Sequence, residues 1–81
     1  MKKVDGHDNA VLGVMNRFGM EPVICYDRSK IIKNLVKDGM TEDEAEEFFE
    51  FNIIGAWVWE DTPCFLSKMP LKQIEEEYEY E

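Results

Sequence analysis

Four carboxylates with helical spacing form the pattern in this chain that could most readily do chemistry. Asp43, Glu46, Glu47 and Glu50 stand at positions i, i+3, i+4 and i+7, which places them on one face of a helix about two turns long. Paired carboxylates can hold a metal or act as general acid and base where a pocket moves their pKa values apart. Because no Glu-x-x-His pair accompanies them, a di-iron site of the four-helix type is excluded. The pattern leaves two readings: a solvated helix face or an acidic docking surface for a basic partner.

A second candidate is the local cluster Asp5-Gly6-His7-Asp8. Imidazole and carboxylate groups are common ligands of divalent ions. His7 is the only histidine, however, and the spacing matches neither an EF-hand loop nor a zinc motif. We therefore expect an exposed turn and no metal site.

Candidate nucleophiles also lack the patterns that would activate them. Neither Ser29 nor Ser67 lies in a Gly-x-Ser-x-Gly elbow, and no glycine-rich phosphate loop occurs. Cys25 and Cys64 lie 39 positions apart in apolar runs, which is typical of free buried thiols. The sequence thus predicts a non-enzymatic protein with no catalytic residue, no cofactor and no metal.

Charge is distributed unevenly along the chain. Residues 1–38 carry seven Lys or Arg and five Asp or Glu, whereas residues 39–81 carry two and thirteen. The strongly acidic second half would repel phosphate groups. We therefore expect a basic protein partner and no direct binding to nucleic acid or to a membrane.

The first third of the chain has the pattern of a β-hairpin. Residues 1–9 are polar apart from the methionine and one valine, and are expected to be a lead-in. Residues 10–17 and 23–26 are β-prone segments, and the Phe18–Pro22 segment between them contains the glycine and proline of a turn.

Two consecutive capped helices are expected next. Asp27 is a candidate N-cap for a helix that buries Ile31, Ile32, Leu35 and Val36, and Gly39 suits its C-terminal end. Thr41 and Glu44 form a capping box that begins a second helix, which ends near Gly55. The residues expected on its main face, all apolar except Asn52, are Ala45, Phe48, Phe49, Asn52, Ile53 and Ala56.

Apolar residues outside that main face make the second helix unusual. Because Phe51 and Ile54 fall on another side, this helix should lie at the centre of the core or also form a subunit interface.

Short strands and an acidic tail are expected to complete the chain. Residues 56–59 and 63–66 have strand patterns, and Trp57 and Trp59 would share one strand face. We expect Trp57 to be partly buried, and we assign Trp59, Glu60 and Asp61 to a loop that contributes to partner binding. Residues 71–81 are an acidic tail in which Leu71, Ile74 and Tyr78 have the spacing of a short docked helix.

These elements predict a single α+β domain over residues 1–81 with one core, because the chain is too short for a second. It contains an N-terminal β-hairpin, two consecutive α-helices, short C-terminal strands and an acidic tail. No apolar stretch approaches the length of a membrane span or a signal peptide, so we expect a cytoplasmic protein.

Several short motifs resemble those of small bacteriophage-encoded proteins of unassigned function. They are Asp5-Gly6, Arg17-Phe18-Gly19, Tyr26-Asp27, Asp38-Gly39-Met40-Thr41, the run from Glu47 to Trp57, and Thr62-Pro63. The resemblance spans residues 5–66. It implies a phage accessory protein in the host cytoplasm and carries no activity with it.

Two functions follow as hypotheses. The first is a non-enzymatic protein that binds a basic host or phage protein, in one form as a nucleic-acid mimic, through the four helix carboxylates and the Trp59–Asp61 loop. The second is a small structural homo-oligomer, such as a homodimer, in which Phe51 and Ile54 pack against another copy.

Overall fold

The structure is a computed structural model that describes residues 1–56 and 62–78. Its first two strands form a β-hairpin. Strand β1 (Val11–Met15) pairs antiparallel with strand β2 (Val23–Asp27). The register shifts near the start of β1, where Val11 lies opposite Tyr26 but Gly13 lies opposite Cys25. A shift of this kind is a β-bulge, which bends an edge strand and increases its twist. The predicted hairpin is thus confirmed.

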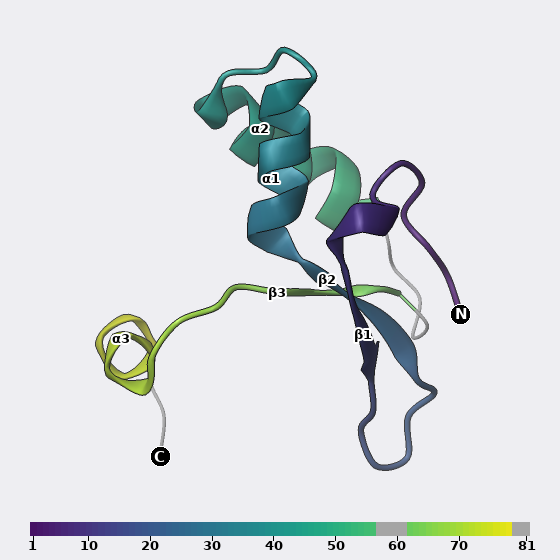
Figure 1. The fold of residues 1–81 in the computed structure, drawn as a ribbon. Coiled ribbons are helices and arrows are strands. Elements are labelled where there is room, and N and C mark those ends of the chain that lie inside the picture. Colours follow the sequence, from purple (N-terminus) through teal and green to yellow (C-terminus); the bar gives the residue numbers. More distant parts are fainter. Residues whose placement is uncertain (57–61, 79–81) are drawn as a thin grey trace.

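A third strand completes the sheet on the other side of β2. Strand β3 (Cys64–Leu66) runs parallel to β2, so the order is β1-β2-β3. Parallel neighbours require a long crossover connection, and the two predicted helices lie within it. Figure 1 shows these helices together at one end of the molecule, with β1 and β2 extending away from them.

Helix α1 (Arg28–Lys37) follows β2 without a loop because Asp27 is both the last strand residue and the helix N-cap. The Asp27 carboxylate accepts a 3.0 Å hydrogen bond from the Ser29 backbone N–H. At the other end Gly39 has a φ of +114°, a left-handed conformation that glycine adopts without a Cβ clash. Both predicted ends are confirmed.

Helix α2 (Glu42–Phe48) begins at the predicted capping box. The Thr41 hydroxyl accepts a 3.2 Å hydrogen bond from the Glu44 N–H, and the Glu44 carboxylate accepts one of 2.9 Å from the Thr41 N–H. The helix continues as a π-helix, η2 (Phe49–Ile54), which the sequence did not predict. Its last turn is closed by a 3.0 Å bond from the Gly55 N–H to the Glu50 carbonyl.

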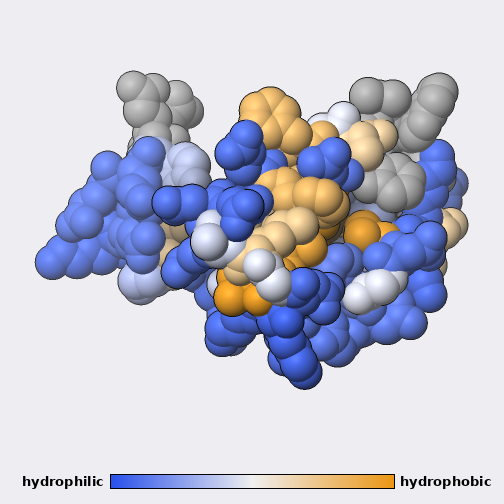
Figure 2. Space-filling view, turned by 90° about the horizontal axis from the view of Figure 1, so that it is seen from above, coloured by the Kyte–Doolittle hydropathy of each residue, from blue (hydrophilic) through white to orange (hydrophobic). Residues whose placement is uncertain are grey.

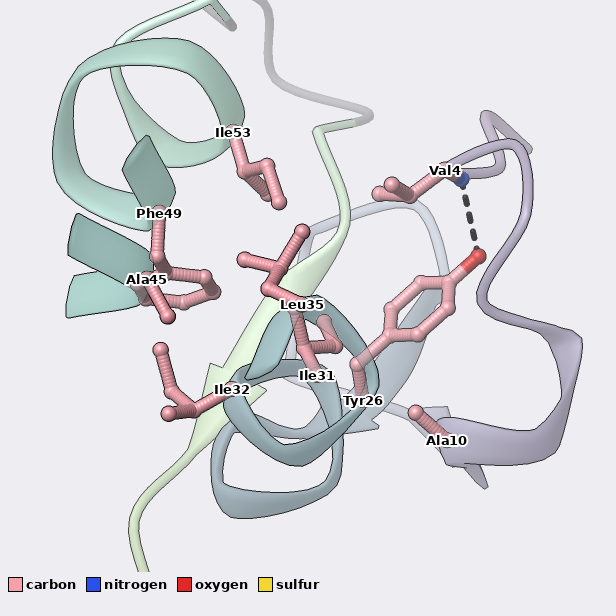
Figure 3. Close-up of a cluster of buried hydrophobic side chains, with 9 residues drawn as sticks. All are labelled: Val4, Ala10, Tyr26, Ile31, Ile32, Leu35, Ala45, Phe49 and Ile53. Atoms are coloured by element: carbon pink, nitrogen blue, oxygen red, sulfur yellow. Dashed lines mark hydrogen bonds between the residues drawn. The ribbon is translucent and has the colours of Figure 1, made fainter. Parts of the chain in front are cut away.

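One hydrophobic core lies between the helices, the sheet and the N-terminal segment. Phe65 of β3 stacks on Tyr26 at 5.8 Å between ring centroids and meets the edge of Phe49 at 5.1 Å. The α+β class with a single core is confirmed. The buried apolar residues drawn in Figure 3 are Val4, Ala10, Tyr26, Ile31, Ile32, Leu35, Ala45, Phe49 and Ile53.

The faces of the two helices differ in part from those predicted. Val36, expected on the apolar stripe of α1, is exposed, and Phe48, Asn52 and Ala56 of the second helical segment are also on the surface. The wider turn of the π-helix separates residues three apart more than an α-helix does, so Asn52 no longer lies beside the buried Phe49. The buried positions Ala45, Phe49 and Ile53 are four residues apart.

The N-terminal segment packs against the fold. The backbone N–H of Val4 donates a 2.8 Å hydrogen bond to the Tyr26 hydroxyl (Figure 3), and the 3-10 turn η1 (Asp8–Ala10) follows. His7 was expected in an exposed turn, which is wrong, because its side chain is buried and its Nδ1 lies 3.1 Å from the Asn34 amide nitrogen. The hydrogen bond to Asn34 of α1, which is distant in sequence, satisfies the polar imidazole and so allows its burial.

Helix α3 (Leu71–Glu77) lies beyond the end of β3, apart from α1 and α2 (Figure 1). The predicted short helix therefore exists. Of the three residues expected to dock it, Leu71 and Tyr78 are exposed and Ile74 is half-buried. No helix among residues 1–56 and 62–78 has the length and hydrophobicity needed to cross a bilayer.

Candidate docking surface

The four predicted carboxylates lie on α2 and η2, but they do not share one environment. Asp43, Glu47 and Glu50 are exposed, whereas Glu46 is half-buried. Arg28, the first residue of α1, makes a two-pronged contact with Glu46 through both terminal guanidinium nitrogens. The same guanidinium lies 3.5 Å from Glu50. The helix therefore has a paired side, with Glu46 and Glu50, and a second side that carries Glu47.

The paired side is built around Arg28. Its guanidinium carbon lies 4.9 Å from the centre of the Phe49 ring, a cation–π distance. The side-chain hydrogen bond to Glu46 raises the pKa of Arg28, with Glu50 adding to the effect. These contacts join α1 to α2 at the edge of the core. The four carboxylates are therefore not equivalent, because one cation from the preceding helix pairs with two of them.

The other side forms a groove, which we call the Phe51 groove. It has a volume of about 350 Å³ and is open to solvent. Phe51 is 74% exposed and Phe48 is 36% exposed, so two aromatic rings are accessible at neighbouring helix positions. The residues that line the groove are Met40, Glu44, Glu47, Phe48, Phe51 and Asn52.

An apolar area is exposed at the helical end of the molecule (Figure 2). Figure 2 looks down on the helical end of the molecule and shows an apolar area bordered by hydrophilic residues. Exposed apolar patches with polar rims are typical of binding sites. Glu44 and Glu47 provide anionic groups at the groove itself, and Asp43 lies one turn before Glu47 on α2.

Glu44 has a structural role as well. Its carboxylate accepts the Thr41 backbone N–H, and this hydrogen bond lowers the pKa of Glu44. The negative charge is thus retained at the helix N-terminus, where the helix dipole also favours it. Glu44 therefore both helps to cap α2 and adds negative charge to the Phe51 groove.

Metal chemistry has no geometric support in the described part of the chain. Within residues 1–56 and 62–78, no three His, Cys, Asp or Glu side chains are grouped to hold a metal ion. His7 contacts an asparagine, and two of the four helix carboxylates contact an arginine. What the described surface offers is an apolar contact area with anionic neighbours.

Sequence reasoning placed Phe51 outside the main helix face but did not place it in a groove. Its position follows from the π-helix, for which the sequence gives no clear signal. Nor did any pattern connect Arg28 to Glu46, which lies 18 positions later. Of the predicted docking residues, Trp59, Glu60 and Asp61 lie outside the described residues, and their role stays a prediction.

Comparison of the chain with protein-family models, curated proteins and solved structures gave no match. The resemblance to phage-encoded proteins therefore stays a prediction.

Proposed function

We propose that this chain is a non-enzymatic interaction protein that binds a basic protein segment in the Phe51 groove. The observation that carries the proposal is the exposure of Phe51 and Phe48 beside Glu44 and Glu47. A large exposed aromatic ring is an effective anchor because it buries much area with few rotatable bonds. The nearby carboxylates add attraction for lysine and arginine side chains.

The expected partner is an amphipathic helix with apolar residues on one face and basic residues beside it. Such helices commonly bind in grooves through side chains one turn apart. The Trp59–Asp61 loop is proposed to extend the surface, as the sequence suggested. In one form of the proposal the acidic groups occupy a phosphate-binding surface of the partner and so mimic a nucleic acid. The phage-like motifs would place this activity in the host cytoplasm.

Two synthetic peptides test the groove directly. The first is a helical peptide of leucine and lysine, and the second has every lysine replaced by glutamate. We expect the basic peptide to shift the NMR signals of Phe48, Phe51 and Glu47, and its affinity to fall as salt is added. Equal binding of the acidic peptide would contradict the proposal.

Matched variants separate the groove from the general acidity of the chain. We expect Glu47→Lys and Phe51→Ser each to weaken binding of the basic peptide by about tenfold or more, the range of a hot-spot residue. Glu76→Lys makes the same charge change on α3, away from the groove, and should have little effect. If Glu47→Lys and Glu76→Lys weaken binding equally, the attraction is nonspecific and the groove is not the site.

A homo-oligomer is the second candidate. An interface between copies would require exposed apolar residues, and Phe51 and Ile54 are both exposed. Sedimentation velocity over a range of concentrations distinguishes the two functions. A monomer at all micromolar concentrations contradicts the oligomer. A dimer that Phe51→Ser dissociates would favour it over the peptide-binding proposal.

A further inference from the structure

The two cysteines of the chain face each other across neighbouring strands. Cys25 of β2 and Cys64 of β3 are paired residues in the parallel register. Paired residues on adjacent strands lie roughly 5 Å apart and point to the same face of the sheet. Both side chains are half-buried, so the prediction of two buried thiols is only partly correct. Their proximity could not be derived from a separation of 39 positions.

The thiols point to the sheet face that α1 and α2 do not cover. Tyr26 and Phe65, one residue further along each strand, stack in the core beneath the helices. Side chains alternate between the two faces of a strand, so Cys25 and Cys64 point away from that core.

A small hollow gives access to this face of the sheet. It has a volume of about 260 Å³, and Cys64 lines it together with Arg17 and Glu21. Thioether and aliphatic side chains, from Met15, Met20 and Val23, line the rest with Thr62. A small molecule can therefore approach the strand position where Cys64 is paired with Cys25.

We propose that Cys25 and Cys64 form a reversible intrachain disulfide by exchange with a small-molecule disulfide such as oxidised glutathione. The thiolate of one cysteine attacks one sulfur of the small molecule, which forms a mixed disulfide and releases one small thiolate. The second cysteine then loses its proton to solvent and attacks the sulfur of the first, which releases the second small thiolate. Two protein thiols are oxidised, and the small disulfide is reduced to two thiols after it takes up the two protons.

The environment of Cys64 favours an uncharged product. Burial makes the larger contribution and the side-chain hydrogen bond to Cys25 the next, and together they raise the pKa of Cys64 to about 11. A thiolate is therefore disfavoured at this position, whereas a disulfide carries no charge and avoids the penalty.

The strand geometry favours a reversible bond over a permanent one. The spacing of paired strand residues falls within the Cα separation that disulfides accept. Their Cβ atoms, however, run side by side and must lean together to reach the shorter Cβ separation of about 3.8 Å that a disulfide prefers. A disulfide formed under this constraint is more easily reduced than an unconstrained one.

Exchange with glutathione tests the proposal in the full-length chain. The protein is equilibrated with mixtures of reduced and oxidised glutathione, and the products are measured by intact mass spectrometry and thiol alkylation. We expect both thiols to be lost together, with a mass decrease of two hydrogens. A digest without reductant should contain one peptide pair joined through Cys25 and Cys64.

The same titration in urea shows whether the fold brings the thiols together. The flexible loop of the unfolded chain gives a low effective concentration, so we expect the folded chain to form the disulfide at least about tenfold more favourably. Equal values in urea and in buffer would overturn the proposal. Stable glutathione adducts on the folded wild-type chain, or bonds only between chains, would also overturn it.

Single-cysteine variants and a charge variant test the individual steps. Cys64→Ser and Cys25→Ser should each accumulate a glutathione adduct on the remaining cysteine, since the second attack is removed. Arg17→Gln should slow the reaction with anionic oxidised glutathione while leaving that with uncharged hydroxyethyl disulfide unchanged, because Arg17 is the basic group lining the hollow. If neither single-cysteine variant forms an adduct, the exchange mechanism is contradicted.

Discussion

The two sides of the helical segment formed by α2 and η2 carry similar residues but have different roles. On one side Glu46, Glu50 and Phe49 pack around Arg28, which joins the segment to α1. On the other side Glu47 and Phe51 meet no such cation in the contacts of the described structure and border an open groove. The comparison teaches that carboxylate spacing does not decide whether a helix face is structural or available. The neighbouring element decides it.

The largest expected effect compares the two adjacent phenylalanines. Phe49→Ala should lower the free energy of unfolding by about 3–5 kcal/mol, because it leaves a cavity at a fully buried site. Phe48→Ala should cost only about 1 kcal/mol, because the ring is partly exposed already. Urea unfolding measures both. Equal losses would mean that the segment is not oriented as described.

A substitution at Gly55 tests the π-helix, because it adds atoms at the end of that helix. A Cβ added at Gly55 would lie 2.8 Å from the Phe51 carbonyl oxygen and 3.1 Å from that of Glu50. Because both obstacles are backbone atoms, Gly55→Ala should destabilise the chain by about 1–3 kcal/mol. Gly55→Ser adds a Cβ at the same place and should lose a similar amount. A gain in stability for Gly55→Ala, as expected for an ordinary helix interior, would contradict the π turn.

Removing the cation should make the two sides alike. Arg28→Met keeps the aliphatic contact with Phe49 but frees Glu46 and Glu50. We expect a loss of about 1 kcal/mol in stability, the range of partly exposed ion pairs and cation–π contacts. Affinity for the basic peptide should rise severalfold, since the acidic surface becomes larger. As a control, Lys33→Met also removes one positive charge from α1, but it should change neither the stability nor the peptide affinity appreciably. An equal rise in affinity for Lys33→Met would mean that net charge alone explains the effect.

The smallest effect concerns the start of the segment and depends on pH. The pKa of Glu44 is lowered in the folded chain by the Thr41 N–H, so its contribution to stability is present above the unfolded pKa. That contribution is lost as pH falls from about 4.5 through the lower folded value. Glu44→Gln keeps an oxygen acceptor without the charge. The difference in urea midpoint between wild type and this variant should shrink between pH 6 and pH 3, and an unchanged difference would contradict the assignment.

Local patterns in the sequence were sufficient to predict the hairpin and the ends of the first two helices. Asp27, Gly39 and the Thr41–Glu44 box fix helix ends through hydrogen bonds and backbone conformations that involve only neighbouring residues. The turn residues between β1 and β2 likewise specify a hairpin. Such interactions involve only residues a few positions apart, so they can be recognised in the sequence. This is why the α+β class could be predicted.

What the tertiary structure alone decided depends on residues distant in sequence. The pairing of Arg28 with Glu46, the burial of His7 against Asn34 and the alignment of Cys25 with Cys64 all join segments 18 or more positions apart. The π-helix also changes the directions in which the side chains after Phe48 point, and no residue pattern predicts it. Such contacts arise because packing sets strand register and helix rotation for a whole element at once, and so they fix which carboxylates, rings and thiols are available.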